Sequence, residues 1–116
     1  APYQSDFDKK LIRGPKYETL EEPISKDYHV RFYDLDMNGH VNNSKYLDWV
    51  FEVMGADFLT NHIPKKINLK YVKEVRPGGM ITSSYELNQL ESNHQVTSDG
   101  DINAQAKIIW QEINTD

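Results

Sequence analysis

Apolar and polar residues alternate along several stretches of this chain, which is the two-residue period of a half-buried β-strand. In residues 27–33 the apolar positions of this pattern are Tyr28, Val30 and Phe32. The same period recurs in three later stretches, which we also predict to be strands: residues 64–75, 80–91 and 104–113. Residues 92–101 are more polar and predict a short strand at most, closed by a turn at the sequence DGD.

One stretch repeats with a different period. From about Asn43 to Leu59 the large apolar residues fall at helical spacing, and charged residues take the other positions. We predict one long amphipathic helix here, capped by Asn42 or Asn43, because a short amide side chain can accept from the unpaired N–H groups of a first turn. Its apolar face should form the centre of the core, through Tyr46, Leu47, Val50, Phe51, Met54 and Phe58.

The order of strand, long helix and three or four further strands indicates a fold class. It predicts an α+β domain in which an antiparallel sheet wraps around one central helix. Such a sheet has free edges, so we expect it to pair with a second copy or with a sister domain.

Length and composition narrow the classes of function. The chain has 116 residues, enough for one domain, and we assign residues 1–26 to a linker or N-terminal extension and residues 27–116 to the domain. The 13 basic residues are outnumbered by 18 acidic ones, for a net charge of -5, which argues against nucleic acid as a partner. No apolar run is long enough to span a bilayer, and no signal peptide is evident, so we expect a cytoplasmic protein.

The sequence contains no cysteine, which excludes disulfides, thiolate metal sites and a cysteine nucleophile. The four histidines have no metal-ligand spacing, and no phosphate-binding glycine motif occurs, so we expect neither a metal nor a cofactor. We interpret Trp49 and Trp110 as packing residues.

The loop DLDMNGHVNN, residues 34–43, concentrates the polar side chains that suit catalysis. Asp36, Asn38 and His40 occupy alternate positions just before a predicted helix N-terminus, where unpaired N–H groups and a positive dipole end can stabilise an oxyanion. His40 can donate a hydrogen bond or move a proton near neutral pH. The alternative is purely structural, because Asp, Asn and Gly are also the ordinary turn and capping residues.

The segment RFYDLDMNGHVNNSKYLDWVFE, with its motif DMN-x-HVNN-x-KY, resembles the acyl-acyl carrier protein (acyl-ACP) thioesterases, specifically the second, C-terminal hotdog domain of a bacterial member. The likeness runs from about Tyr28 to Tyr85 and continues more weakly to the last strand. It implies a hotdog fold and hydrolysis of the thioester that joins a fatty acyl chain to acyl carrier protein, without a metal.

The resemblance also implies a catalytic set: Asp36, Asn38, His40 and, in the segment YVKEV, Glu74. Glu74 would activate a water molecule, and backbone N–H groups near Asn42 and Asn43 would bind the oxyanion. Strict alternation turns Glu74 away from the face of Tyr71, so either that face lines a cleft shared with a partner domain or a bulge re-aims the side chain. The alternative role for Glu74 is a solvated carboxylate beside its basic neighbours.

Five basic residues lie within 12 positions: Lys65, Lys66, Lys70, Lys73 and Arg76. They are either a docking surface for acidic acyl carrier protein or a charged edge that discourages aggregation. Family members carry two hotdog domains, so an upstream domain or a second copy is the expected partner. Two other functions stay open, a hotdog thioesterase acting on acyl-CoA and a non-catalytic structural half.

Overall fold

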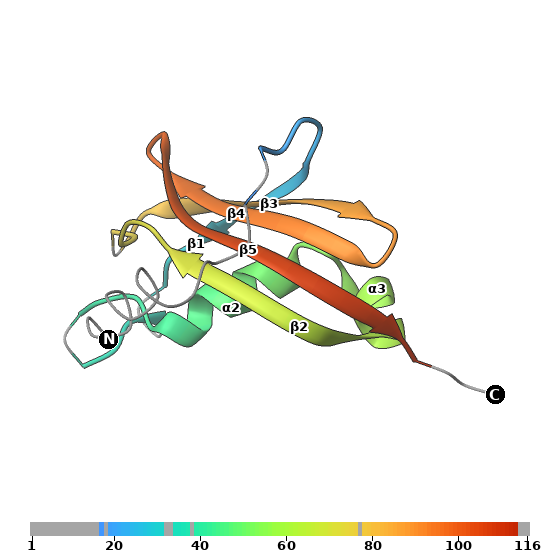
Figure 1. The fold of residues 1–116 in the computed structure, drawn as a ribbon. Coiled ribbons are helices and arrows are strands. Elements are labelled where there is room, and N and C mark those ends of the chain that lie inside the picture. Colours follow the sequence, from blue (N-terminus) through green and yellow to red (C-terminus); the bar gives the residue numbers. More distant parts are fainter. Residues whose placement is uncertain (1–16, 18, 32–33, 38, 77, 114–116) are drawn as a thin grey trace, which may run out of the picture.

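The computed structural model describes residues 17, 19–31, 34–37, 39–76 and 78–113. Within them the chain forms a five-stranded antiparallel sheet and two helices. Figure 1 shows the sheet curving along one side of helix α2, which lies against its inner face. The elements in chain order are β1 (Ile24–His29), α2 (Asn43–Glu52), α3 (Ala56–Asn61), β2 (His62–Tyr71), β3 (Met80–Asn88), β4 (Glu91–Ser98) and β5 (Asp101–Glu112).

The strands lie in the order β1-β3-β4-β5-β2, so β1 and β2 form the two edges. The turn between β4 and β5 lies at Asp99 and Gly100, as predicted, and both residues have positive φ, which matches the twist of a tight hairpin. The register shifts once between β4 and β5, because Ile102 pairs with Thr97 while Ala104 pairs with Val96. Asn103 is therefore the extra residue of a β-bulge on β5.

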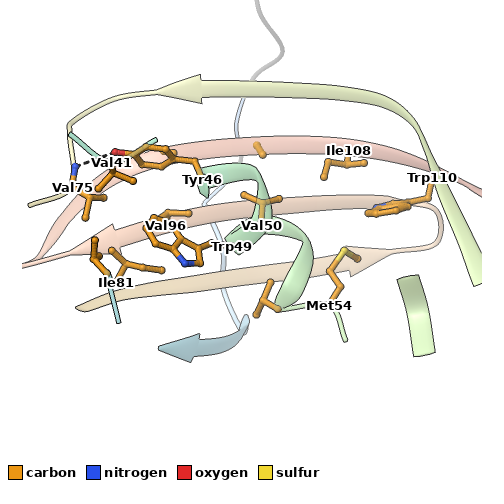
Figure 2. Packing of buried hydrophobic residues seen from close by; sticks show 14 residues of the cluster. Val41, Tyr46, Trp49, Val50, Met54, Val75, Ile81, Val96, Ile108 and Trp110 are labelled. Atoms are coloured by element: carbon orange, nitrogen blue, oxygen red, sulfur yellow. Dashed lines mark hydrogen bonds between the residues drawn. The ribbon is translucent and has the colours of Figure 1, made fainter. Parts of the chain in front are cut away.

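The core lies between α2 and the inner face of the sheet, as Figure 2 shows. Trp49 and Val50 of the helix are 1% exposed, and Ile108 of β5 is fully buried. Trp110 is also buried, and its ring meets those of Phe51 and Phe58 edge to face. Both tryptophans are thus packing residues, as predicted, and large side chains of this kind dominate the free energy of core formation.

The predicted long helix is two shorter ones, so the expectation of one helix over residues 43–59 is wrong. Helix α2 ends at Glu52, and Gly55, with a φ of 88°, redirects the chain into α3. A positive φ of this size is inexpensive only for glycine, so the break is encoded at that position. Because the apolar spacing continues across the break, periodicity alone did not reveal it.

The strand boundaries also differ from the prediction: β3 ends at Asn88 rather than at residue 91, β5 spans Asp101–Glu112 rather than residues 104–113, and the larger differences concern the other three strands. β1 begins at Ile24, inside the stretch assigned to the N-terminal extension, and ends at His29; Phe32 and Tyr33 lie outside the described residues. β4 is a full strand over Glu91–Ser98, because its inward positions Ser92 and His94 are polar yet buried. β2 ends at Tyr71, so Glu74 does not lie on a strand. The division into residues 1–26 and 27–116 stays a prediction.

Candidate active site

The loop before α2 is a short hairpin closed on itself. Leu35 and Val41 form an isolated antiparallel bridge, and the N–H of Asp36 donates to the carbonyl of His40 at 2.7 Å. The N–H of His40 donates back to Oδ1 of Asp36 at 3.1 Å. Gly39 has a φ of 79°, which allows the tight return. Asp36 therefore fixes the backbone from which the His40 side chain projects.

The base of this hairpin is held by a buried carboxylate. Asp34 is 4% exposed, accepts the N–H of Arg31 at 2.7 Å and lies 3.5 Å from Nζ of Lys45. Its carbonyl accepts the N–H of Asn42 at 2.8 Å, which joins the hairpin to the start of α2. Burial of a carboxylate is costly unless it is paired and hydrogen-bonded, so this contact set ties the loop to the helix.

Asn42 is the N-cap of α2, as predicted. Its Oδ1 accepts from the N–H of Ser44 at 3.1 Å, a normal capping bond. The N–H of Lys45 donates to the carbonyl of Asn42 at 2.9 Å. The next amide, that of Asn43, has no hydrogen-bond partner within the described part of the chain. Asn43 therefore offers the N–H that α2 leaves available to a ligand.

Glu74 lies in the irregular segment between β2 and β3, close to the loop hairpin in space. Its backbone passes over the first turns of α2, because the neighbouring Val75 is buried in the core and its N–H donates to the hydroxyl of Tyr46 at 3.1 Å. Figure 2 shows this bond between the helix and the segment. The sequence pattern predicts a shared cleft or a β-bulge to explain how the Glu74 side chain could face the site. Neither is needed, because β2 ends at Tyr71 and Glu74 lies beyond it.

His40 and Glu74 meet side chain to side chain. Nδ1 of His40 is hydrogen-bonded to Oε2 of Glu74, and both side chains are 56% exposed. The bond to Glu74 and its negative charge raise the pKa of His40 above its ordinary value, and Asp36 adds to the effect. Residues 34 positions apart in sequence thus form one polar site that is open to solvent in this chain.

The predicted site residues divide into three groups. The structure brings together Asp36, His40 and Glu74, and it places Asn42 and Asn43 at the adjoining helix start. Asn38 lies outside the described residues.

Neither helix described in the structure is long and apolar enough to cross a membrane, and the described histidines and carboxylates form no group of three that could hold a metal ion.

Sequence reasoning missed three residues that shape the site: Asp34, Tyr46 and Asn103. In the sequence Asp34 has the character of a turn residue and Tyr46 that of a core residue. No local signal shows that Asp34 accepts the N–H of Arg31 or that Tyr46 accepts the N–H of Val75 next to Glu74. Asn103 lies near the start of β5 and bonds to the backbone beside Glu74. Asn103 falls just before the stretch predicted as the last strand, residues 104–113, among other polar residues, so no local signal marked it.

Residues 17–112 match the family described as the acyl-ACP thioesterase C-terminal domain. The chain belongs to this family. The hotdog fold expected of it is confirmed, since solved thioesterase structures superpose on most of the chain. The predicted bacterial origin stays a prediction.

Two curated relatives of this acyl-ACP thioesterase domain are plant enzymes. The chain is 37% identical over 75 residues to an acyl-[acyl-carrier-protein] hydrolase, FATB2, of Cuphea viscosissima, covering 64% of this chain and 18% of the relative. It is 30% identical over 96 residues to oleoyl-acyl carrier protein thioesterase 2 of Arabidopsis thaliana, covering 83% and 25%. Both relatives are named as chloroplastic. The chain spans a quarter or less of either relative's length.

A solved structure also matches this chain over part of its length. The 12:0-ACP thioesterase of Umbellularia californica superposes with a TM-score of 0.74 at 25% identity, covering 85% of this chain and 40% of that chain. The acyl-ACP thioesterase domain described here therefore superposes on less than half of that structure.

Proposed function

We propose that this domain hydrolyses the thioester of fatty acyl-acyl carrier protein to a free fatty acid, as the half of a double-hotdog enzyme that bears the catalytic residues. The observation that carries the proposal is the contact between His40 and Glu74. It joins the two segments in which the family resemblance lies and sets them beside a helix N-terminus, where an oxyanion is stabilised.

In the proposed reaction Glu74 is the general base. Its Oε2 is engaged by His40, so its other carboxylate oxygen takes a proton from water as the water oxygen attacks the thioester carbonyl carbon. The tetrahedral intermediate then collapses, the carbon–sulfur bond breaks, and the same proton passes to the departing sulfur. The products are a fatty acid and the carrier protein's thiol, and Glu74 returns to its starting charge.

The remaining residues orient the groups that react. His40, held by Asp36, holds the Glu74 carboxylate in place, and Asn38 is proposed to hold the substrate or the water. We assign the oxyanion contact to the N–H of Asn43 rather than to that of Asn42, because the latter already donates to the carbonyl of Asp34. Asn42 contributes as the cap that sets the helix start.

The decisive experiment measures hydrolysis of medium- and long-chain acyl-ACP by the full-length protein and by this chain, each with and without Glu74→Gln. We expect the substitution to lower kcat in the full-length protein by about 100-fold or more, within the range typical of a lost general base. Glu112→Gln is the matched control, since it makes the same chemical change at the far end of β5.

Two outcomes separate the proposal from its alternatives. Unchanged turnover in full-length Glu74→Gln would leave the domain as a non-catalytic half. Faster hydrolysis of acyl-CoA than of acyl-ACP would assign it to the hotdog thioesterases that act on coenzyme A. If this chain alone is inert while the full-length variant loses activity, the chemistry lies here and the acyl site lies elsewhere in the protein.

Acyl carrier protein is the proposed partner, and the basic residues of β2 and the following segment are its proposed docking surface. All five are exposed: Lys65, Lys66, Lys70, Lys73 and Arg76. Lys73 already pairs with Asp101 at 2.6 Å, so Lys66 and Lys70 are the better test. We expect Lys66→Glu with Lys70→Glu to raise KM for acyl-ACP and to leave KM for acyl-CoA nearly unchanged.

The second proposed partner is an upstream hotdog domain or a second copy of this chain. The support is the edge strand β2, whose inward-facing residues Ile67 and Tyr71 are 40% and 49% exposed. An edge of this kind offers unpaired backbone groups and apolar area to another sheet. A cytoplasmic location also stays a proposal; the absence of cysteine suits a reducing compartment.

A further inference from the structure

The segment that carries Glu74 is attached to the sheet through Asn103 and through the ion pair between Lys73 and Asp101, and Asn103 makes most of the contacts. The N–H groups of Val72 and Lys73 both donate to the carbonyl of Asn103, at 2.8 and 3.1 Å. The side-chain amide of Asn103 returns the contact, since its Nδ2 donates to the carbonyl of Lys73 at 3.0 Å and reaches that of Glu74 at 3.4 Å. Four contacts therefore link Asn103 to three consecutive residues that end at Glu74.

Asn103 is itself fixed on every side. It is 1% exposed, and its Oδ1 accepts from the hydroxyl of Ser98 at 2.7 Å, which leaves Nδ2 to face the segment. The bulge between β4 and β5 places this polar residue outside the regular inward and outward alternation. A buried amide that satisfies its donors and its acceptor in this way is costly to replace, because its partners would be left unpaired.

We propose that Asn103 is a positioning residue for the catalytic carboxylate, with Ser98 orienting its amide so that Nδ2 holds the backbone on which Glu74 stands. The inference rests on the proposed role of Glu74. The need for such a device follows from the fold: β2 ends at Tyr71, so no ladder fixes the backbone at Glu74, and its side chain is more than half exposed. Catalysis depends on placement to within about 1 Å.

Two side chains restrain the backbone next to Glu74, and they act on different residues. Tyr46 fixes Val75 from the helix side, whereas the amide of Asn103 fixes the carbonyls of Lys73 and Glu74 from the sheet side. Without the Asn103 side chain the segment keeps its backbone bonds from Val72 and Lys73 and its anchor at Val75, but the two carbonyls between these anchors are released. The contact between Glu74 and His40 is then the first to be lost, because both side chains are open to water.

The test uses the titration of His40 by NMR, which reports the His40–Glu74 contact without relying on turnover. In the wild-type chain the pKa of His40 is raised by Glu74, and Glu74→Gln gives the reference value without the carboxylate. We expect Asn103→Ala to lower the pKa of His40 toward that reference, and Ser98→Ala to lower it by a smaller amount. In the full-length protein Asn103→Ala should reduce kcat by about 10- to 100-fold with little change in KM.

Ile108→Val is the matched control, since it loosens the same strand in the core without touching the segment. It should leave the His40 titration as in the wild type. A folded Asn103→Ala chain with an unchanged His40 pKa would overturn the inference; if that variant does not fold, an unchanged pKa in Ser98→Ala overturns it. Failure of the proposed function is a separate result, namely normal turnover in Glu74→Gln.

Discussion

At the scale of single residues, the charge on His40 separates the two ways in which the His40–Glu74 pair can act. If Glu74 is the base, His40 is the cationic donor that holds it, and activity falls as the pH rises through the raised pKa of His40. We expect this descending limb in kcat/KM for acyl-ACP, displaced to higher pH than the ordinary pKa of a histidine would give. A pH–rate profile of the full-length enzyme measures it.

The opposite slope would assign the base to His40. A histidine that takes the proton must be neutral, so activity would rise through the same pKa, with Glu74 as the group that orients the ring. His40→Gln supplies the control, because its profile should lose whichever limb His40 causes. Histidine at positions 29, 62 and 94 is retained in that variant, so a limb that persists would belong to another group.

The buried His94 should make the stability of the fold depend on pH. Its ring is 3% exposed, Nε2 shares a hydrogen bond with Ser92 at 2.7 Å, and burial lowers its pKa to about 3. An unfolded histidine protonates near pH 6.5, so the unfolded state binds more protons between about pH 6.5 and pH 3. The free energy of unfolding should therefore decrease as the pH falls through this window.

His94→Gln removes that titration while keeping a polar side chain beside Ser92. We expect urea midpoints measured from pH 7 to pH 4 to depend less on pH in this variant than in the wild type. His29→Gln, at an exposed position of β1, is the control and should keep the wild-type slope. Equal slopes in the wild type and His94→Gln would show that carboxylates alone govern acid unfolding.

At the scale of elements, the bond from Val75 to Tyr46 couples helix α2 to the segment that carries Glu74. Tyr46→Phe keeps the aromatic ring, whose centroid lies 5.7 Å from that of Trp49 and 5.2 Å from that of Tyr71. It removes the hydroxyl that accepts the N–H of the buried Val75. We expect a loss of about 1–3 kcal/mol in the free energy of unfolding. Chemical denaturation measures it.

Tyr28→Phe is the matched control, because that hydroxyl makes no hydrogen bond to the described residues. It should cost well under the loss seen in Tyr46→Phe. Turnover should fall in Tyr46→Phe as well, because the segment is released on its helix side. A stability loss without any change in kcat would mean that Asn103 alone suffices to position Glu74.

The same elements show what the pattern of residues could and could not predict. The helical spacing around Tyr46 and Val50 predicted the central helix because each turn buries one of these side chains. It could not predict the break at Gly55, where the apolar spacing continues but the backbone turns. β4 was underestimated because its polar residues Ser92 and His94 are buried in the folded chain, where one hydrogen bond joins them and the Trp110 indole N–H also donates to Ser92.

For the site, too, the local features could be predicted from the sequence and the long-range contacts could not. The helix cap is local, so the asparagines at positions 42 and 43 predicted it, and the Asp, Asn and Gly residues before them indicated a turn, although not the closed hairpin. The meeting of His40 with Glu74 is long-range, and the family resemblance rather than periodicity pointed to it. The supports from Tyr46 and Asn103 join segments far apart in sequence, and no short-range pattern encodes them.

At the scale of the whole molecule, the edge strand β2 supports the proposed pairing with an upstream domain or a second copy. Ile67, Leu69 and Tyr71 stand in register with Ile108, Ala106 and Ala104, which are buried, so β2 extends the inner face of the sheet. The ring of Tyr71 meets that of Tyr46 in α2, yet Ile67 and Tyr71 remain 40% and 49% exposed. Apolar residues on an exposed edge favour pairing with another sheet. The relatives' greater length makes an upstream domain the first candidate for this place in the full-length protein.

When this chain is studied alone, a second copy should occupy the same edge. We expect sedimentation equilibrium to show a dimer that Ile67→Lys converts to a monomer, since a lysine in that position places a charge in the contact. Leu87→Lys is the control, because Leu87 on β3 is exposed to a similar degree, 42%, but lies away from β2. A dimer that survives Ile67→Lys but is lost in Leu87→Lys would move the interface toward the β1 edge of the sheet, and the partner domain would then not pair along β2.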